Sequence, residues 1–380
     1  MQKTAQKKRK LPQHCAGVAL VLQGGGALGA YQGGVYQVLA DHGYEPGWVA
    51  GISIGAINAA IIAGNQRDQR VEKLRAFWEK ITDGRFQAPG FGGDFARSAL
   101  NDVSAMSVMT HGVPGFFQPR IPPPWFRVPG TDGATSFYDT APLKGTLLEV
   151  IDFEHLKAGS VRLSVGAVNV ATGNSTYFDS HHHTIGPEHV MASAALPPGF
   201  PAIEIDKEFY WDGGVVSNTP LQYLLDERQH KNTLVFQVDL FSSRGAVPGS
   251  LPDVYERQKD IVYSSRTRFN TDRFREAQDL RRASARILEK LPKALRSDPD
   301  VKLVEASLSD ATMSIVQLIY RNKGYESQSK DYEFSRASME EHWQSGVDDT
   351  LRTLKHEKEW LKEPSRFDGV RTFDMTRDFD

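Results

Sequence analysis

The chain has 380 residues, of which 40% are hydrophobic and 24% are charged, and its formal net charge is -2. These values are typical of a soluble globular protein that forms one large domain or two moderate ones. The near-neutral charge gives no general attraction to nucleic acid, so no nucleic-acid partner is expected. The single cysteine, Cys15, excludes an internal disulfide, and its place before an apolar run favours a packing role.

Residues 1–16 are predicted to form a basic, disordered tail. The apolar run at 18–22 is too short for a signal peptide and leads directly into glycines. No stretch reaches the ~18 to 20 apolar residues that span a bilayer. We therefore expect a cytoplasmic protein without a signal peptide or a transmembrane segment, which meets membranes only at their surface.

The segment that follows the tail is typical of an α/β protein. A buried strand is predicted over 17–23, and three glycines end it at 24–26. Apolar residues at helical spacing predict a helix over 29–42. A short strand at 48–50 then leads into a helix over 53–63 that is rich in Ala and Ile. This alternation of strands and helices predicts a mainly parallel central sheet.

Residues 84–135 differ in composition, since Pro, Gly and aromatic residues dominate. Long irregular segments in compact domains are usually functional or disordered, and disordered segments are poor in aromatics. We interpret 84–135 as an apolar lid or substrate-channel insertion. The alternative is a loop that packs down on the core.

The sheet is predicted to resume at 161–170 and at 233–240. Residues 241–380 are then expected to form a mostly helical C-terminal extension. It contains two long helical patterns and two short apolar runs that are expected to add edge strands: 252–291, 335–361, 301–304 and 314–320.

Ser53 lies at the centre of Gly51-Ile52-Ser53-Ile54-Gly55, between a predicted strand and a predicted helix. The pattern Gly-x-Ser-x-Gly in this context is typical of a nucleophile elbow, in which serine occupies a strained turn. Gly51 and Gly55 would let neighbouring backbone pass close to that turn. The sequence therefore predicts Ser53 as a catalytic nucleophile.

The run Gly24-Gly25-Gly26-Ala27-Leu28-Gly29 has the form G-x-G-x-x-G, so a dinucleotide site is one interpretation. That site also requires an acidic residue about 20 residues on, at the end of the second strand, and none stands there. The other interpretation is an oxyanion hole, in which consecutive backbone N–H groups stabilise the charge on an attacked carbonyl. The two turns lie side by side in a parallel sheet, which allows this run to converge on Ser53.

A catalytic serine needs a base, and the chain has 11 histidines. Three follow in the order of a Ser-Asp-His triad: His230, His342 and His356. All three lie in polar segments and are expected to be solvated surface residues. The cluster at 181–183 is not expected to bind metal, because adjacent histidines in an extended loop do not face one point.

Asp212 is the stronger candidate for the base. It precedes Gly213 and Gly214 after an apolar segment. An aspartate followed by two glycines is also a common turn, so the pattern alone leaves both interpretations open.

The glycine run, the Gly51–Gly55 motif and the Asp212-Gly213-Gly214 block, in this order, resemble the patatin-like phospholipase family over about residues 17–240. Residues 192–197 and 218–220 resemble the family as well. The segment 334–343 is similar to an extension that a subset of bacterial members carries. The resemblance implies a three-layer α/β/α patatin-like fold.

In that family a Ser–Asp dyad replaces the triad, which implies Ser53 as the nucleophile and Asp212 as its base. Gly24, Gly25 and Gly26 would form the oxyanion hole. The expected function is a lipid acyl hydrolase of the phospholipase A or lysophospholipase type, acting through an acyl-enzyme without cofactor or metal. Many members have Asp where Gln23 stands, and a basic residue after the glycines, where this chain has Ala27.

Other functions stay open at this point. They are a serine esterase, thioesterase or acyltransferase on another acyl ester, and, more remotely, a nucleotide-binding protein that uses the glycine run. Basic residues also outnumber acidic ones over 266–296, which favours contact with an anionic membrane together with the aromatics of 84–135. A solvated helix face is the alternative.

Overall fold

The computed structural model describes residues 11–82, 93–131, 133–227, 232–308, 311–365 and 368–375. Within these ranges a nine-stranded sheet has the order β11-β10-β9-β1-β2-β5-β8-β7, and β6 pairs with β5. Six strands run parallel: β1 (Gly17–Leu22), β2 (Trp48–Ile52), β5 (Arg162–Asn169), β9 (Thr233–Asp239), β10 (Met313–Ile319) and β11 (Val370–Asp374). Antiparallel pairing adds β6 (Ser175–Asp179), β7 (Ile203–Ile205) and β8 (Glu208–Asp212).

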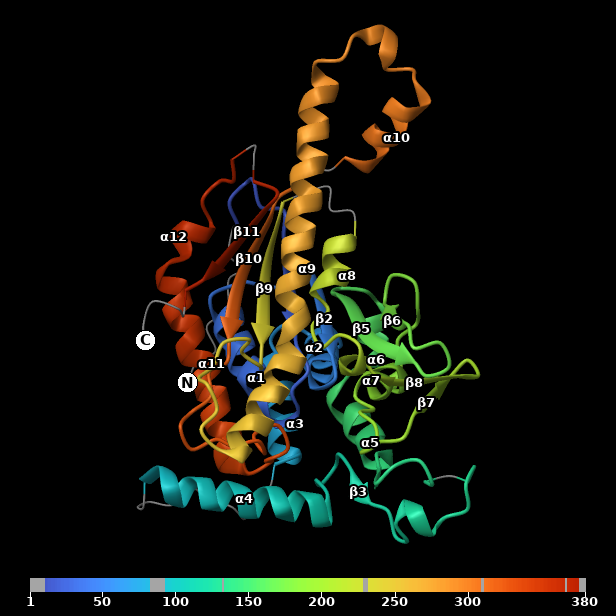
Figure 1. The fold of residues 1–380 in the computed structure, drawn as a ribbon, viewed down its shortest axis with the longest axis vertical. Helices are drawn as coiled ribbons and strands as arrows, with labels where there is room; N and C mark the ends of the chain where they lie inside the picture. The colour runs from blue at the N-terminus through green and yellow to red at the C-terminus, as the bar shows by residue number, and fades with distance from the viewer. Residues whose placement is uncertain are drawn as a thin grey trace.

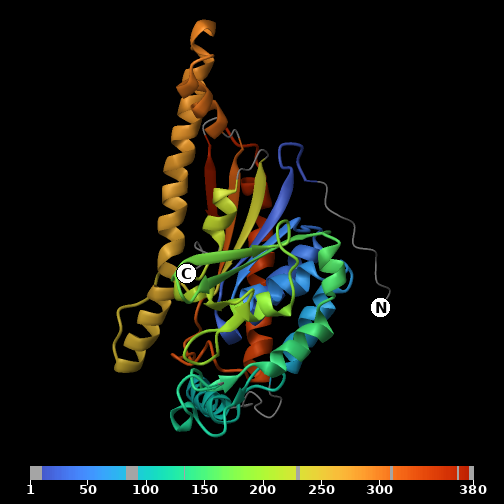
Figure 2. The same cartoon turned by 90° about the vertical axis from the view of Figure 1, so that its right-hand side faces the viewer.

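Helices cover both faces of this sheet, which gives the predicted three-layer α/β/α architecture (Figure 2). One face packs against α1 (Ala30–Asp41), α2 (Ile54–Ala63), α3 (Arg70–Lys80) and α11 (Arg336–Lys355). The other face packs against α8 (Leu221–Asp226) and the 39-residue α9 (Leu251–Glu289). Further helices are α4 (Gly93–His111), α5 (Ala141–Val150), α6 (Phe153–Lys157), α7 (Pro187–Ser193), α10 (Pro299–Ser307) and α12 (Glu357–Trp360).

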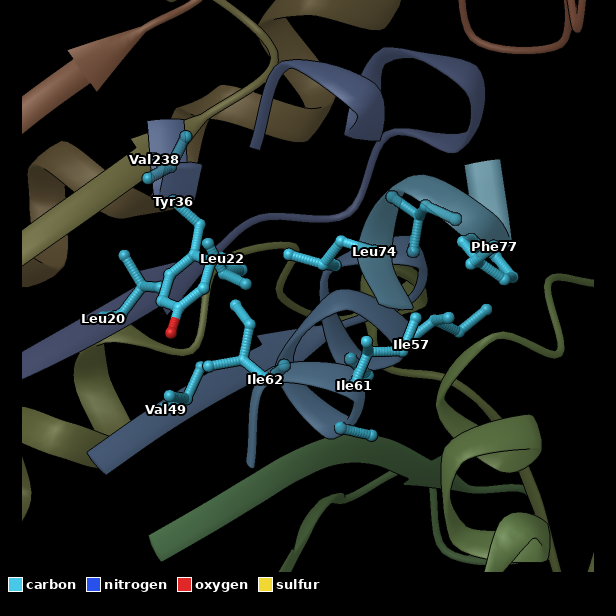
Figure 3. Packing of buried hydrophobic residues seen from close by; sticks show 14 of the residues in the cluster. Leu20, Leu22, Tyr36, Val49, Ile57, Ile61, Ile62, Leu74, Phe77 and Val238 are labelled. Atoms are coloured by element: carbon cyan, nitrogen blue, oxygen red, sulfur yellow. The ribbon is translucent and has the colours of Figure 1, made fainter. Parts of the chain in front are cut away.

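The core on the first face explains why α2 is apolar at every position except Asn58. Figure 3 shows Ile57, Ile61 and Ile62 of α2 between the strands and Leu74 and Phe77 of α3. All ten residues of α2 are buried, as expected of a helix enclosed between a sheet and other helices. The beginning of α2, which carries the candidate nucleophile, is therefore fixed by tight packing.

The insertion is more regular than its composition predicts. Residues 83–92 lie outside the described ranges, and α4 (Gly93–His111) follows them as a 19-residue helix. A short hairpin of β3 (Gln118–Pro119) and β4 (Tyr138–Asp139) comes next. Both α4 and β3 lie at the end of the molecule toward which β9 and β10 point (Figure 1).

Some aromatic residues of the insertion pack on the core, and others are exposed as expected of an apolar lid. Phe116 and Phe117 are buried against Phe200, and Phe116 also contacts Phe334. Other apolar side chains of the insertion are exposed, with Trp125 at 68% and Phe126 at 75% of their full surface. Part of the segment thus packs down on the core, and part presents apolar surface to the outside.

Residues 241–380 are mostly helical, as predicted, and their strands β10 and β11 extend the central sheet beyond β9. The predicted strand at 314–320 is confirmed as β10, although it lies inside the sheet between β9 and β11. The predicted strand at 301–304 is wrong, since these residues belong to α10. Helix α10 and the end of α9 project beyond the sheet (Figures 1 and 2). An apolar run of four residues cannot by itself distinguish a strand from a helix.

No helix of the described ranges is both long enough and apolar enough to cross a bilayer. Residues 1–10, most of the expected basic tail, lie outside those ranges.

Close packing of α1 on α11 joins the C-terminal region to the N-terminal unit. A Cβ at Gly34 would overlap the carbonyl oxygen of Trp343, and one at Gly346 would overlap that of Tyr31. We expect Gly34→Ala to lower the free energy of unfolding by about 1–3 kcal/mol, because overpacked sites must shift their backbone. Urea denaturation measures this change.

The matched control is Gly145→Ala in α5, where a Cβ would meet nothing within 4 Å. That variant should be neutral or about 0.5–1 kcal/mol more stable, because alanine is the better helix former. Equal effects of the two substitutions would contradict the packing described for α1 and α11.

Candidate functional site

Ser53 occupies the turn from β2 into α2 with φ 57° and ψ -129°. A positive φ is strained for a residue with a side chain and persists only where the surroundings enforce it. The Ser53 N–H donates to the carbonyl oxygen of Ser193 at 3.1 Å and to its Oγ at 3.0 Å. The Ser193 hydroxyl in turn donates to the carbonyl of Gly166 at 2.6 Å. Helix α7 thus holds the strained turn from one side.

The glycines of the motif allow three backbone segments to meet at this turn. A Cβ at Gly51 would overlap the carbonyl oxygen of Gly55, and a Cβ at Gly55 would overlap that of Leu22. Only residues without a side chain permit these approaches. Ser53 is half-buried, and the N-terminal end of α2 favours negative charge beside it.

Asp212 is brought to Ser53 by the sheet. It pairs with Ala167 across β8 and β5, and β5 lies beside β2. A Cβ at Gly213 would lie 2.7 Å from the Gly166 carbonyl oxygen, so this position also needs glycine. Two strands that are distant in sequence therefore place the aspartate near the serine.

The carboxyl group of Asp212 is 1% exposed, and its Oδ1 accepts the Gly214 N–H at 2.7 Å. Burial raises the pKa of Asp212 to about 7, while the Ser53 hydroxyl and the Gly214 N–H oppose that rise. Its Oδ2 is buried and has no well-aligned hydrogen bond within the described ranges. The Ser53 hydroxyl thus lies close enough to lower the pKa of Asp212, and Oδ2 is the carboxyl oxygen that has no hydrogen-bond partner within the described ranges.

The glycine run passes directly over the serine. A Cβ at Gly24 would lie 2.9 Å from the Ser53 Cβ. The Gly24 N–H, however, donates to the Asn218 carbonyl at 3.1 Å, which removes it from the expected set of oxyanion donors. Among the described residues, the N–H groups of Gly25 and Gly26 have no partner. Of the three glycines predicted to form an oxyanion hole, Gly25 and Gly26 are thus the two whose N–H groups have no partner within the described ranges.

Gln23 and Asn218 hold the glycine run on both sides. The fully buried Gln23 side chain accepts the N–H groups of Leu240 and Phe241 at 2.6 and 2.9 Å. It donates to the Thr219 hydroxyl at 2.9 Å. The Asn218 amide donates to the Gly24 carbonyl at 2.9 Å. A glutamine supplies both a donor and an acceptor at position 23, and all of its contacts are to neutral groups.

The histidine candidates are not placed with Ser53 by any described contact. His342 is buried, which corrects the expectation of a solvated residue, and its Nε2 pairs with Glu326 at 2.8 Å. His356 pairs with Glu359 at 3.1 Å, and His230 lies outside the described ranges. The side chains of the described residues offer no group of three His, Cys, Asp or Glu that could hold a metal ion.

A cleft of about 810 Å³ lies between α9 and the carboxyl ends of β9, β10 and β11. Neither Ser53 nor Asp212 lines it. Its wall includes Asp239, a second buried carboxyl group whose pKa burial raises to about 7. The raised pKa alone therefore does not identify the base, and proximity to Ser53 is what distinguishes Asp212.

Sequence reasoning missed the supporting roles of Ser193, Asn218 and Gln23. The first two lie in segments that resemble the family, which was the available signal, although the resemblance suggested no contact for them. The Asp331 carbonyl oxygen accepts the Ala27 N–H at 2.8 Å. No sequence pattern predicted this contact, because only the tertiary fold brings Asp331 to the glycine run.

The fold and site define a class: a three-layer α/β/α protein with a strained serine between strand and helix and a buried aspartate beside it. A family model described as Patatin-like phospholipase matches residues 20–225, and one described as Patatin phospholipase matches 261–366. The first match covers more than half of the chain. The chain therefore belongs to the patatin-like phospholipase family.

A curated relative is the cGAMP-activated phospholipase of Pseudomonas aeruginosa (strain BWHPSA011 / Pa011), 35% identical over 103 residues. That match covers 24% of this chain and 30% of the relative, so it spans less than a third of the relative's length.

Two solved structures are also similar. VipD from Legionella pneumophila has 15% identity and a TM-score of 0.41, with 97% of this chain and 76% of that one covered. ExoU from the type III secretion system of Pseudomonas aeruginosa, in complex with SpcU, has 12% identity and a TM-score of 0.30, with 77% and 61% covered.

The raised pKa of Asp212 predicts a dependence of stability on pH. The pKa of aspartate is about 3.9 in an unfolded chain and rises to about 7 here, so the folded state binds more protons between these values. The contribution of Asp212 to stability therefore falls as pH rises from about 4 to about 7. Asp212→Asn removes this loss, and its free energy of unfolding should rise relative to wild type by up to a few kcal/mol between pH 4 and pH 8.

Urea denaturation across that pH range measures the difference. Asp239 contributes equally to both proteins, so its effect cancels. Asp68→Asn at an exposed position controls for the substitution itself. A constant difference between Asp212→Asn and wild type at all pH values would contradict a buried, proton-binding Asp212.

Proposed function

We propose that this chain is a lipid acyl hydrolase that cleaves fatty-acyl esters of the phospholipase A or lysophospholipase type through a Ser53–Asp212 dyad. The observation that carries the proposal is the strained Ser53 beside a buried carboxyl group whose pKa is raised to about 7. Membership of a family named for phospholipases supports a lipid substrate.

The first half of the reaction follows from these groups. Asp212 accepts the Ser53 proton as the Ser53 Oγ attacks the ester carbonyl carbon, and the carbonyl oxygen takes up negative charge. The N–H groups of Gly25 and Gly26 stabilise that oxyanion. When the tetrahedral intermediate collapses, the C–O bond to the alcohol breaks and Asp212 returns the proton to the leaving oxygen. An acyl-enzyme remains on Ser53.

Water completes the cycle. Asp212 takes a proton from the water that attacks the acyl carbonyl. When the bond between the Ser53 Oγ and the acyl carbon breaks, Asp212 gives this proton to Oγ and the fatty acid leaves. A base with a pKa near 7 is better suited to these transfers than an ordinary aspartate, because a more basic carboxylate removes a hydroxyl proton more readily. Above about pH 7 the deprotonated form of Asp212 predominates.

A second candidate is an esterase, thioesterase or acyltransferase that acts on another acyl ester. It is favoured by Ala27, Leu28 and Gly29, which supply no cation beside the glycine run for a phosphate headgroup. Phospholipids, lysophospholipids, acylglycerols, short esters and thioesters, with products read by mass spectrometry, distinguish the candidates. The nucleotide alternative loses its motif-based argument, since contacts within the chain account for the glycines.

We expect Ser53→Ala and Asp212→Asn each to abolish ester hydrolysis, by about a thousandfold or more, while the protein stays folded. The measurement is fatty-acid release, together with covalent labelling by a fluorophosphonate probe that disappears in Ser53→Ala. His230→Ala and His342→Ala are the controls for a triad. Full activity of Asp212→Asn beside inactivity of a histidine variant would overturn the dyad.

We also propose that the exposed apolar loop at 120–128 contacts anionic membrane. Ile121, Trp125, Phe126 and Val128 are each at least 68% exposed, and Arg120 and Arg127 stand among them. The loop follows β3 at the end toward which β9 and β10 point (Figure 1). Strands β1 and β2 run parallel to β9, so the glycine run and Ser53, which follow them, lie at the same end. The projecting part of α9 is at the opposite end, so one membrane surface does not meet both regions.

Sedimentation with anionic vesicles at low and high salt tests this proposal. A Trp125→Ser, Phe126→Ser double variant should weaken binding about tenfold or more, because each ring removes a large apolar surface from the contact. A Leu280→Ser, Ile287→Ser variant in the C-terminal half of α9, where both side chains are exposed, is the matched control. Absence of wild-type binding at low salt would end the proposal, and equal loss in both variants would contradict the assigned loop.

A further inference from the structure

The segment between β10 and α11 reaches back to the glycine run. The Asp331 carbonyl oxygen accepts the Ala27 N–H at 2.8 Å. Gly26 has φ 54°, and a Cβ there would overlap the same oxygen. This carbonyl therefore fixes the turn that directly follows Gly25 and Gly26, whose N–H groups are the proposed oxyanion donors.

Lys330, the neighbour of Asp331, is anchored inside the protein. Its side chain is 0% exposed, and its Nζ pairs with Asp260 at 2.7 Å and Glu256 at 3.1 Å. Both carboxylates belong to α9. The Asp331 carboxylate pairs with Lys259 of the same helix at 2.7 Å. Charges of both signs therefore join residues 330 and 331 to one face of α9.

The same part of α9 also touches the residue that precedes the glycines. The Tyr263 carbonyl accepts a hydrogen bond from the Gln23 side chain at 3.2 Å. The ring centroids of Tyr263 and Phe241 lie 5.1 Å apart. The Lys330 ammonium lies 5.8 Å from the centroid of the Phe241 ring. Residues 256–263 thus contact Gln23, the residue before the glycine run, directly. They reach Gly26 and Ala27 indirectly, through Lys330 and Asp331.

A buried lysine paired with carboxylates is a poor source of stability compared with apolar packing, because the charges lose their hydration. Its effect on position is specific, however, since a fully buried side chain with two partners on α9 restricts where residue 330 and its neighbour can lie. We infer that Lys330 is a positioning residue that aligns the Gly25 and Gly26 N–H groups, an inference that rests on the proposed oxyanion role of these two glycines. The C-terminal region then takes part in the active site without touching the substrate.

The test compares Lys330→Met with wild type in the full-length chain. We expect kcat for ester hydrolysis to fall about tenfold to a hundredfold with KM nearly unchanged, because misplaced donors weaken transition-state binding alone. The rate at which a fluorophosphonate labels Ser53 should fall by a similar factor. Lys330→Arg, which keeps the charge, should recover part of kcat.

Arg70→Met is the matched control for the loss of a buried ion pair. Arg70 pairs with Glu45 at 2.8 Å, and both side chains are less than a tenth exposed. The recorded partners of Arg70 are Asn65, Tyr36 and Glu45, none of them in the glycine run. This variant should lose thermal stability and keep kcat within about twofold of wild type.

The outcomes separate the positioning role from the proposed function. If kcat falls no further in Lys330→Met than in Arg70→Met while labelling still requires Ser53, the positioning role is wrong and the dyad stands. If Ser53→Ala keeps its activity, the proposed function itself fails. Should Lys330→Met not fold, the double variant Lys330→Met, Asp260→Asn removes the more deeply buried of the two carboxylates that lose their partner, and the same kcat comparison decides.

Discussion

The positive φ of Ser53 is the constraint around which this end of the molecule is organised. A serine does not keep that conformation unaided, so three neighbouring segments enforce it. The buried helix α2 holds its C-terminal side, Ser193 of α7 binds its N–H, and the glycine run packs over its Cβ. The strain leaves the side chain half-buried at the edge of the sheet rather than enclosed in the core.

The groups around Ser53 come from segments that meet only at the carboxyl ends of the strands. The sheet brings Asp212 from β8, and Gln23 and Asn218 hold the glycines in place. Burial of Asp212 then changes its chemistry, because a carboxyl group that is removed from water holds its proton more tightly. One arrangement thus accounts for a half-buried serine on a strained turn, for a carboxyl group of raised pKa beside it and for two N–H groups without a partner in the described chain.

Local sequence patterns predicted the elements that carry the site, since β1, α1, β2 and α2 follow one another with short connections and clear glycine stops. They predicted less well where the structure depends on distant partners. The strand at 301–304 is a helix, the insertion contains the 19-residue α4, and His342 is buried against Glu326. In each case the deciding neighbour is far away in sequence, or the local apolar pattern is too short to separate helix from strand.

The sequence by itself determined the parallel α/β order, the serine between two glycines and the three blocks that resemble the patatin-like family. These features are local, because a glycine needed for a close approach is needed at one definite position in the chain. Only the tertiary structure decided that the Gly24 N–H is bonded to Asn218, that β10 and β11 extend the sheet, and that Lys330 and Asp331 join α9 to the glycine run. Those facts depend on distances between segments up to about 300 residues apart, which burial and hydrogen-bond satisfaction set only after the chain has folded.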